Sequence, residues 1–378
     1  IYLGLLNDYT GPYAAAAGAL ELAQRAFWLW ANTTGGIGGY SVAIIDGKDT
    51  GYSPAKHLEG YNAIRDEVAA LAMSLGTVQT LFIMDEMDKD NMVAAPMSWY
   101  SGWGYKSFDR GLVAEFGSAY CVDGMNALDW GLENLPKEIN TVGIIAYAGE
   151  YGDDYAAGVR KAAIANGVTV AWSYVPPVAE FDVAAALGLM LTQPVDAVFS
   201  GAPLSAGPQI IGGYYQQTGA LPFIFNAAPA YNDAFIAEGF PVRDLYLSGA
   251  VYNMAWVGPF ETDTPGHAAM RATWGNFSDS ASSYVVAGWS SQYHIKGVLE
   301  AAAKGGDLTR AGIRRAASNV TVESDGMMTP RELGLDGPDP ESTITAPDAS
   351  VGSGSATVKA NYAGPTASAY DWSQGPCS

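Results

Sequence analysis

The feature that most constrains the fold is a regular alternation of short apolar runs with longer helical patterns. Tyr2–Leu6 has the pattern of a buried strand, a helical pattern follows from about Ala15 to Ala31, and Tyr40–Ile45 is apolar again. Ser53 and Pro54 then supply the cap and the first-turn proline of another helix. This alternation predicts a mostly parallel sheet with helices on both faces.

The alternation continues and then restarts after a helical pattern at Asp123–Leu135. Strand candidates before that helix are Val68–Leu75, Met92–Met97 and Leu112–Phe116. Strand candidates after it are Thr141–Tyr147, Val168–Val175, Val195–Ser200, Pro222–Asn226 and Leu245–Val251. Helices are expected between these strands at Asp153–Asn166, Val183–Leu191 and Pro208–Thr218. The restart predicts a second α/β unit of similar size.

The remaining third of the chain is mainly helical and then changes character. Residues Thr264–Ala317 include a long helical pattern at Ser283–Lys304. Ile344–Thr357 is rich in Ser, Gly, Thr and Ala, which is typical of a loop. Val358–Tyr362 and Ala369–Trp372 are expected to be edge strands.

Length and charge narrow the class of protein. A chain of 378 residues is too long for one ordinary core, and 49% hydrophobic residues can fill two. The formal net charge of −20 would repel a phosphate backbone, which excludes nucleic acid as an expected partner. No stretch is long and apolar enough to span a bilayer. The chain starts inside a strand pattern, so we expect that a targeting segment either is lacking or was removed.

The two cysteines, Cys121 and Cys377, have no metal-ligand spacing around them. A disulfide between them would join the tail of the chain to its middle and would require an oxidising compartment. Two unpaired buried thiols remain the alternative.

Catalytic motifs are missing from the sequence. It contains three histidines, none in a spaced metal motif, and neither a G-x-S-x-G elbow nor a Walker A loop. The acidic cluster Asp85, Glu86, Asp88 and Asp90 could bind a cation, but a solvated helix face is favoured. We therefore expect no enzyme activity, no metal and no cofactor.

A loop of hydroxyls and large rings follows the apolar run Met92–Met97. It contains Ser98, Trp99, Tyr100, Ser101 and Trp103. Ligands of open α/β sheets bind beyond the carboxyl ends of the strands, so this loop is either a binding wall or a packing cluster. For Trp103 we favour packing.

Several local phrases occur in an order that resembles one family, the type I extracytoplasmic solute-binding proteins of ABC importers, and within it the branched-chain amino acid (Leu/Ile/Val)-binding subgroup. The phrases are Thr10-Gly11-Pro12 after the first strand, Trp30-Ala31-Asn32 before Gly35-Gly36-Ile37-Gly38-Gly39, Val42–Asp46, Tyr151-Gly152-Asp153, and Gln216–Gly219 before Leu221-Pro222-Phe223-Ile224.

The resemblance implies an α/β fold of two doubly wound parallel-sheet lobes joined by a hinge that the chain crosses three times. The crossings are expected near Gly117–Cys121, Gly249–Asn253 and Asp325–Thr329. Lobe 1 would comprise residues 1–118 and 252–326, and lobe 2 residues 119–251 and 327–378. Ligand would bind in the cleft between the lobes, whose closure presents it to a membrane permease.

The implied partners are therefore a small-molecule ligand and the permease of an ABC importer. The protein would be a secreted monomer of the periplasm or cell surface, either with or without a lipid anchor before processing. The alternative is a ligand-sensing receptor module of the same fold.

In the first lobe, the resemblance places a ligand carboxylate between two loops, Gly76–Thr80 and Ser98–Ser101. A helix start near Thr77 offers free N–H donors to an anion, although Thr77 could equally be a plain cap. The candidate binding residues of this lobe are Tyr13, Thr77, Val78, Thr80, Ser98, Trp99, Tyr100 and Ser101.

In the second lobe, the matching candidates are Tyr151, Pro203, Leu204, Asn226, Ala228 and Tyr252. Amino acid binders of the subgroup have an acidic residue near Ala228 to pair with the ligand ammonium, and this chain has none there. Asp123 could substitute, or could be a helix cap. An unpaired buried ammonium is costly, so a plain α-amino acid is disfavoured among amino acid-like, amide and aromatic acid ligands. Because Cys121 would open lobe 2 and the tail should pack there, we predict a Cys121–Cys377 disulfide.

Overall fold

The computed structural model describes residues 1–278, 281–351 and 356–377. They form two compact units, one of residues 1–117 and 262–337 and the other of residues 118–261 and 338–378. The chain therefore passes between the units three times. The second and third passages fall after residues 261 and 337, later than the expected 251 and 326. The reason is that strand β10 (Val251–Ala255) belongs to the second sheet, whereas β12 (Arg331–Leu333) pairs with β11 (Val320–Val322) in the first unit.

The first unit is built on a sheet of short parallel strands ordered β2-β1-β4-β5, with β3 also paired to β1. Their bounds are Tyr2–Asn7 (β1), Ala43–Ile44 (β2), Lys48–Asp49 (β3), Ala70–Leu75 (β4) and Ala94–Met97 (β5). Every residue of β4 is buried, as expected of a strand covered on both faces. Because the strands are parallel, their carboxyl ends meet at one edge.

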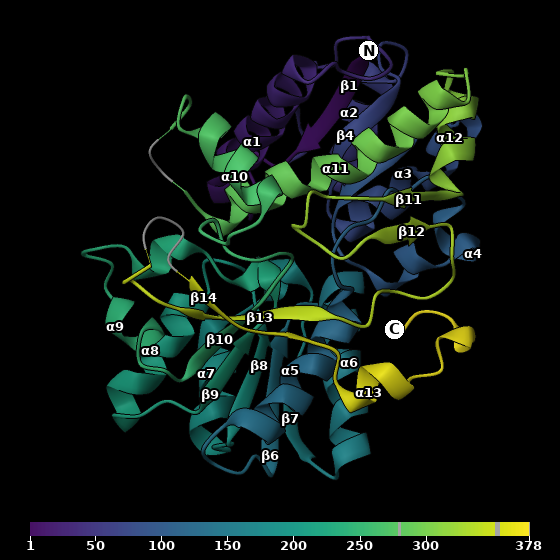
Figure 1. The fold of residues 1–378 in the computed structure, drawn as a ribbon. Helices are drawn as coiled ribbons and strands as arrows, with labels where there is room; N and C mark the ends of the chain where they lie inside the picture. Colours follow the sequence, from purple (N-terminus) through teal and green to yellow (C-terminus); the bar gives the residue numbers. More distant parts are fainter. Residues whose placement is uncertain (279–280, 352–355, 378) are drawn as a thin grey trace. The chain divides into compact units, whose positions relative to one another are not determined.

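Helices cover both faces of this sheet (Figure 1). α1 (Ala14–Thr33) packs on α11 (Ser283–Lys304), and α2 (Pro54–Ile64) packs on α3 (Thr77–Asp90). The strand order with right-handed crossovers places the two pairs on opposite faces. Trp28 Nε1 donates to Gln292 Oε1, and Gln292 Nε2 donates to the Ala72 carbonyl of β4, which joins α1, α11 and the sheet. The unit also contains α4 (Lys106–Asp109), α10 (Pro265–Trp274) and α12 (Arg310–Ala317).

The second unit has a seven-stranded sheet ordered β14-β13-β10-β9-β8-β6-β7. The strands β6 to β10 are parallel, while β13 is antiparallel to both β10 and β14. The other strand bounds are Thr141–Ala146 (β6), Thr169–Tyr174 (β7), Ala197–Gly201 (β8), Phe223–Asn226 (β9), Ser342–Pro347 (β13) and Ala356–Tyr362 (β14). The helices are Tyr120–Asn134 (α5), Glu150–Asn166 (α6), Val183–Thr192 (α7), Gly207–Thr218 (α8), Arg243–Tyr246 (α9) and Pro365–Ala369 (α13).

Helices α5 and α6 touch backbone to backbone through two glycines. A Cβ on Gly158 would lie 2.0 Å from the Cys121 carbonyl oxygen, and one on Gly124 would lie 2.5 Å from the Tyr155 carbonyl oxygen. The predicted disulfide is present beside this contact, and it joins Cys121 of α5 to Cys377 with the Cα atoms 6.2 Å apart. The tail is thereby fixed on the α5–α6 layer.

Some sequence expectations were wrong. Leu245–Val251 is not a strand, because α9 runs to Tyr246 and Gly249 takes a positive φ of 82° before β10. The expected loop at Ile344–Thr357, of which residues 352–355 lie outside the described ranges, contains most of β13. Thr345 pairs with Asn253 of β10 on one side and with Val358 of β14 on the other, a tertiary pairing that composition cannot reveal.

Two further strand predictions also differ. Ala369 ends α13 and Trp372 begins a short 3-10 helix, so Ala369–Trp372 is not an edge strand. Of the strand candidate Leu112–Phe116, only Val113 forms a bridge, to Ala94. In the described residues, no helix has both the length and the hydropathy needed to cross a membrane.

Candidate functional site

The carboxyl edge of the first sheet gathers four loops, which follow β1, β3, β4 and β5. Asp8 holds the first of them, since its carboxylate accepts from the amides of Gly11 (2.6 Å) and Tyr13 (2.8 Å). Asp49, at the end of β3, ties the second loop to the first, because it accepts from the Tyr9 amide and the Thr10 hydroxyl. These carboxylates fix the backbone of the edge.

The first turn of α3 lies at this edge and begins at Gly76, whose φ of 97° requires glycine. The amides of Thr77, Val78 and Gln79 have no hydrogen-bond partner among the described residues, as is usual for the first turn of a helix. Thr77 is 2% exposed, and its Oγ1 also has no partner in the described chain. The turn is therefore a set of unused donors with a positive dipole end, a geometry that suits an anion.

A chain of buried hydroxyls supports this turn from behind. Thr80 Oγ1 lies 2.7 Å from Ser74 Oγ and donates to the Gly76 carbonyl at 2.8 Å. Ser74 Oγ in turn lies 2.9 Å from His57 Nε2, and burial lowers the pKa of His57 to about 3, so the ring is neutral. Because its hydroxyl bonds within the chain, Thr80 is a positioning residue rather than the predicted ligand contact.

Tyr52 is a site residue that sequence reasoning missed. It has a left-handed backbone with a φ of 55°, and its carbonyl accepts from Gln79 Nε2 at 2.8 Å. Its ring centroid lies 4.9 Å from that of Tyr13, and a Cβ on Gly76 would lie 2.8 Å from its Cε2 atom. Tyr13 and Tyr52 thus form an aromatic wall beside the α3 turn. The neighbouring Gly51 and Pro54 indicate a turn, but they do not indicate the direction in which the Tyr52 ring points.

The loop after β5 divides into an edge part and a core part. Ser98 Oγ accepts from Trp103 Nε1 at 3.0 Å, which leaves the Ser98 proton free to donate. The rings of Tyr100 and Trp103 belong to the buried core of the first unit, with centroids 5.6 Å apart. The predicted ligand contact of Tyr100 is therefore not supported, whereas packing of Trp103 is confirmed.

Trp99 and Ser101 of the same loop are also buried, and Val78 is partly exposed. The Trp99 ring packs edge-on against Phe116, and Phe116 lies beside His294. Burial lowers the pKa of His294 to about 3, so this ring stays neutral beneath the loop.

In the second unit, tyrosines gather at the carboxyl edge of the sheet. The Tyr151 ring lies 4.6 Å from Tyr120 and 5.1 Å from Tyr147. A Cβ on Gly201, at the end of β8, would lie 3.3 Å from the Tyr151 hydroxyl oxygen. Pro203 and Leu204 follow β8 directly, so the structure brings them to the same edge as Tyr151.

The loop after β9 supplies no charge. Asn226 Nδ2 donates to Asn253 Oδ1 at 2.9 Å, and Ala228 is buried in a short turn. Tyr252 points elsewhere, since its ring packs against Trp130 and Phe225 beneath α5. The proposed contact of Tyr252 with ligand is not supported by this position.

Asp123 is not available as an ammonium partner. Its Oδ1 accepts from the hydroxyls of Ser118 (2.5 Å) and Ser342 (2.7 Å), and the side chain is 1% exposed. Burial raises the pKa of Asp123 to about 7, and the charge of Asp154 adds to the rise. The carboxyl joins two segments of the second unit, so its role is structural.

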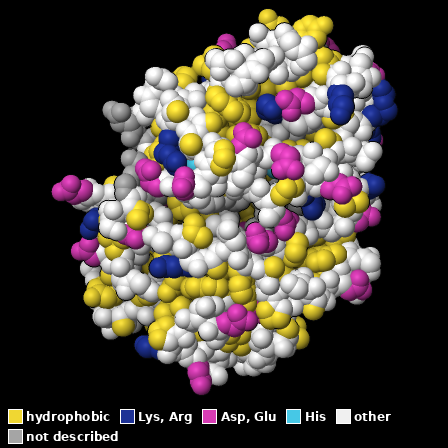
Figure 2. Space-filling view, viewed as in Figure 1, with side chains coloured by type: hydrophobic (Ala, Val, Ile, Leu, Met, Phe, Trp, Pro, Cys, Tyr) yellow, Lys and Arg dark blue, Asp and Glu magenta, His cyan; other side chains and the backbone are white. Residues whose placement is uncertain are grey.

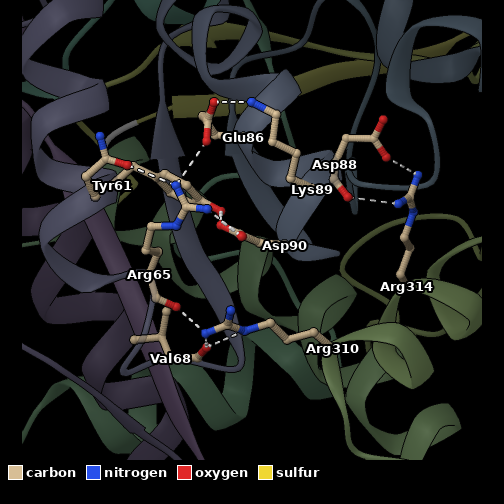
Figure 3. Close-up of polar contacts among 10 residues, drawn as sticks. Tyr61, Arg65, Val68, Glu86, Asp88, Lys89, Asp90, Arg310 and Arg314 are labelled. Carbon is tan, nitrogen blue, oxygen red and sulfur yellow. Dashed lines mark hydrogen bonds and ion pairs between the residues drawn. The ribbon is translucent and has the colours of Figure 1, made fainter.

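The acidic cluster at the other end of α3 is paired rather than open to a cation (Figure 3). Arg65 pairs with Glu86 and Asp90, and Arg314 of α12 pairs with Asp88. Figure 2 shows Lys and Arg side chains gathered over α12. In the described chain, three metal-type ligand residues come together at Cys121, Asp154 and Cys377, where both sulfurs are in the disulfide.

A family model described as periplasmic binding protein matches residues 1–344. Among curated proteins, none matches the chain. A solved structure of a fatty acid ABC transporter substrate-binding protein from Thermomonospora curvata is similar, with 23% identity over 98% of this chain and 94% of that chain and a TM-score of 0.86.

Two further solved structures are similar. One is a branched chain amino acid ABC transporter protein from Thermus thermophilus with bound valine, at 13% identity over 97% of both chains and a TM-score of 0.77. The other is an ABC transporter solute binding protein from R. palustris in complex with benzoate, at 16% identity over 96% of both chains and a TM-score of 0.73. These likenesses confirm the predicted α/β fold with doubly wound, mainly parallel sheets.

Proposed function

Because the chain belongs to the periplasmic binding protein family, we propose that it captures a small carboxylic acid outside the cytoplasm and delivers it, as a monomer, to the permease of an ABC importer. The observation that carries the ligand class is the first turn of α3. There Thr77 Oγ1 is buried without a partner next to unpaired backbone amides. Donors without an acceptor are best satisfied by a carboxylate.

The rest of the ligand is proposed to be apolar or aromatic and to lack an ammonium group. Asn226 to Asn232 contains no carboxylate, and the Asp123 carboxyl is engaged by two serines. Burial of an ammonium group without a counter-charge would cost on the order of several kcal/mol. Tyr13 and Tyr52 beside the α3 turn suit an apolar or aromatic body.

The comparisons are compatible with this choice. Two of the similar structures are described with fatty acids or benzoate, which are carboxylic acids without an α-ammonium group. The third is described with valine, which has one. The disulfide supports an oxidising location outside the cytoplasm. In the described residues, the unpaired donors at the start of α3 and the lack of a carboxylate near Ala228 favour a carboxylic acid without an ammonium group.

The test is isothermal titration with benzoate, medium-chain fatty acids, benzamide and valine. We expect the acids to bind and the amide and valine to bind much more weakly. Thr77→Val should weaken acid binding by about tenfold without loss of thermal stability, because it removes a hydroxyl that has no partner in the protein.

Thr80→Val is the matched contrast. Its hydroxyl bonds within the chain, so this change should lower the melting temperature. Tight valine binding, or an unchanged affinity of Thr77→Val for the best acid, would refute the proposed ligand class.

A further inference from the structure

A second set of unused donors lies in the second unit, at the first turn of α8. This helix spans Gly207–Thr218, and no side chain caps its start. In the described chain the amides of Gly207 and Gln209 have no hydrogen-bond partner, and Pro208 has no amide hydrogen to pair. The turn thus presents free N–H groups and a positive dipole end.

Two buried tyrosine hydroxyls lie beside this turn. Tyr246 is 1% exposed and Tyr231 is 5% exposed, and neither hydroxyl has a hydrogen-bond partner among the described residues. A Cβ on Gly207 would lie 3.4 Å from the Tyr246 hydroxyl oxygen, so this phenol points at the start of α8. The Tyr231 and Tyr246 ring centroids are 6.0 Å apart. A buried hydroxyl without a partner is costly, which indicates a missing acceptor.

All these groups donate. Burial raises the pKa of Tyr246, and burial together with the charge of Asp233 raises that of Tyr231, so both phenols keep their protons. A group of donors without acceptors matches a carboxylate oxygen.

The start of α8 is also reachable. A groove of about 1170 Å³ is lined by residues of α8 and of the segment that leads into α9. Pro208 and Gln209 of the first turn are among its lining residues. A small anion can therefore approach the free amides along the surface of the second unit.

We propose that the start of α8, with the hydroxyls of Tyr231 and Tyr246, is a second binding subsite that takes the carboxylate group of a small acid. It is independent of the site proposed at α3, because it uses residues of the second unit alone. Nothing in the family assignment or in the α3 geometry requires it.

The test follows backbone amide resonances of the deuterated full chain during titration with sodium acetate. The amides of Gly207 and Gln209 should shift and saturate. The amide of Val78 reports the α3 turn separately, so failure of one site leaves the other measurable. Tyr246→Phe should weaken the α8 response by about tenfold, since it removes a hydrogen bond to a charged group.

Gly207→Ala is the second variant. Its new methyl would meet only ordinary contacts, at 3.4 Å from the Tyr246 hydroxyl and 3.8 Å from the Ala230 carbonyl oxygen. It should therefore fill the subsite, leave the fold intact and abolish the acetate response at Gln209. Tyr215→Phe, on an exposed tyrosine of the same helix, should change nothing.

A linear, unsaturated shift of the Gly207 and Gln209 amides would overturn the proposal, as would no shift at all. So would an acetate affinity in Tyr246→Phe and Gly207→Ala equal to that of the wild type, because the phenol and the space beside Gly207 would then play no part.

Discussion

The two ends of α3 differ in how their polar groups are satisfied. At the start, Thr77 and the first-turn amides have no partner in the described chain. At the end, Arg65, Lys89 and Arg314 pair with acidic residues of the helix (Figure 3). Arg110 pairs with Asp85, and Asn91 closes the helix in a left-handed conformation. One helix can therefore have its polar groups paired at one terminus and unpaired at the other, where a ligand can supply the missing hydrogen-bond acceptors.

The largest effect should come from giving the incomplete end its own carboxylate. In Thr77→Asp the new side chain would accept from the first-turn amides and compete with a bound acid. We expect acid binding to fall by about a hundredfold or more, because the dipole end is neutralised and the site is filled.

The stability of Thr77→Asp shows whether the loss of acid binding comes from the site or from unfolding. The free energy of unfolding of Thr77→Asp should stay within about 1 kcal/mol of wild type, since a carboxylate is favourable at a helix start. Denaturant unfolding and acid titration on the same sample measure both quantities. Unchanged acid binding would show that the ligand does not use this turn.

The next effect concerns the anchored end. Arg65→Ala removes the partner of Glu86 and of Asp90, whose other oxygen accepts from the Tyr61 hydroxyl at 2.6 Å. Because Arg65 and Asp90 are mostly buried, we expect a loss of about 2 kcal/mol in unfolding free energy, with unchanged acid affinity.

Lys89→Ala is the control for this end, since Lys89 also pairs with Glu86 but its side chain is 66% exposed. Its unfolding free energy should be indistinguishable from that of the wild type, because exposed ion pairs contribute little. Equal losses in the two variants would mean that the network acts by surface charge alone.

The last effect is a change in how stability depends on pH. The pKa of His57 is near 3 in the folded chain and about 6.5 when unfolded, so its contribution is fully present above pH ~6.5 and is lost as the pH falls toward 3. His57→Gln should therefore remove up to about 1.4 kcal/mol per pH unit from the slope of stability in that window.

The comparison with wild type is needed because Asp109 and Asp123 act in the opposite sense. Burial raises the pKa of each to about 7, so their contribution becomes less favourable as the pH rises from about 4 to 7. These terms cancel in the difference between variant and wild type. A variant with the same slope as wild type would place the titrating group elsewhere.

Sequence patterns predicted the parts of the molecule that follow local rules. The buried run at Val68–Leu75 became β4, the helical period at Ser283–Lys304 became α11, and the helix start expected near Thr77 became the first turn of α3. The periodicity of burial is a property of each element, so it is visible without the fold.

Side-chain direction was much harder to predict. Thr80 and Tyr100 stand near the predicted edge in sequence, yet the hydroxyl of one and the ring of the other turn inward. Tyr52 was missed because its contacts with Tyr13 and Gln79 join residues that are distant in sequence. Asp123 had the signature of a cap or a counter-charge, and only the fold reveals its two serine partners.

The position of β13 has a consequence for biosynthesis. It lies between β10 and β14 and pairs with the edge of β10. Without β13, the backbone N–H and C=O groups on that edge of β10 would be unpaired. A nascent chain that still lacks residues 338–378 exposes this flank to other chains, and unpaired strand flanks are templates for aggregation. Completion of the second sheet must therefore wait until residues 338–378 have been synthesised, and a holding chaperone would protect the chain over that interval.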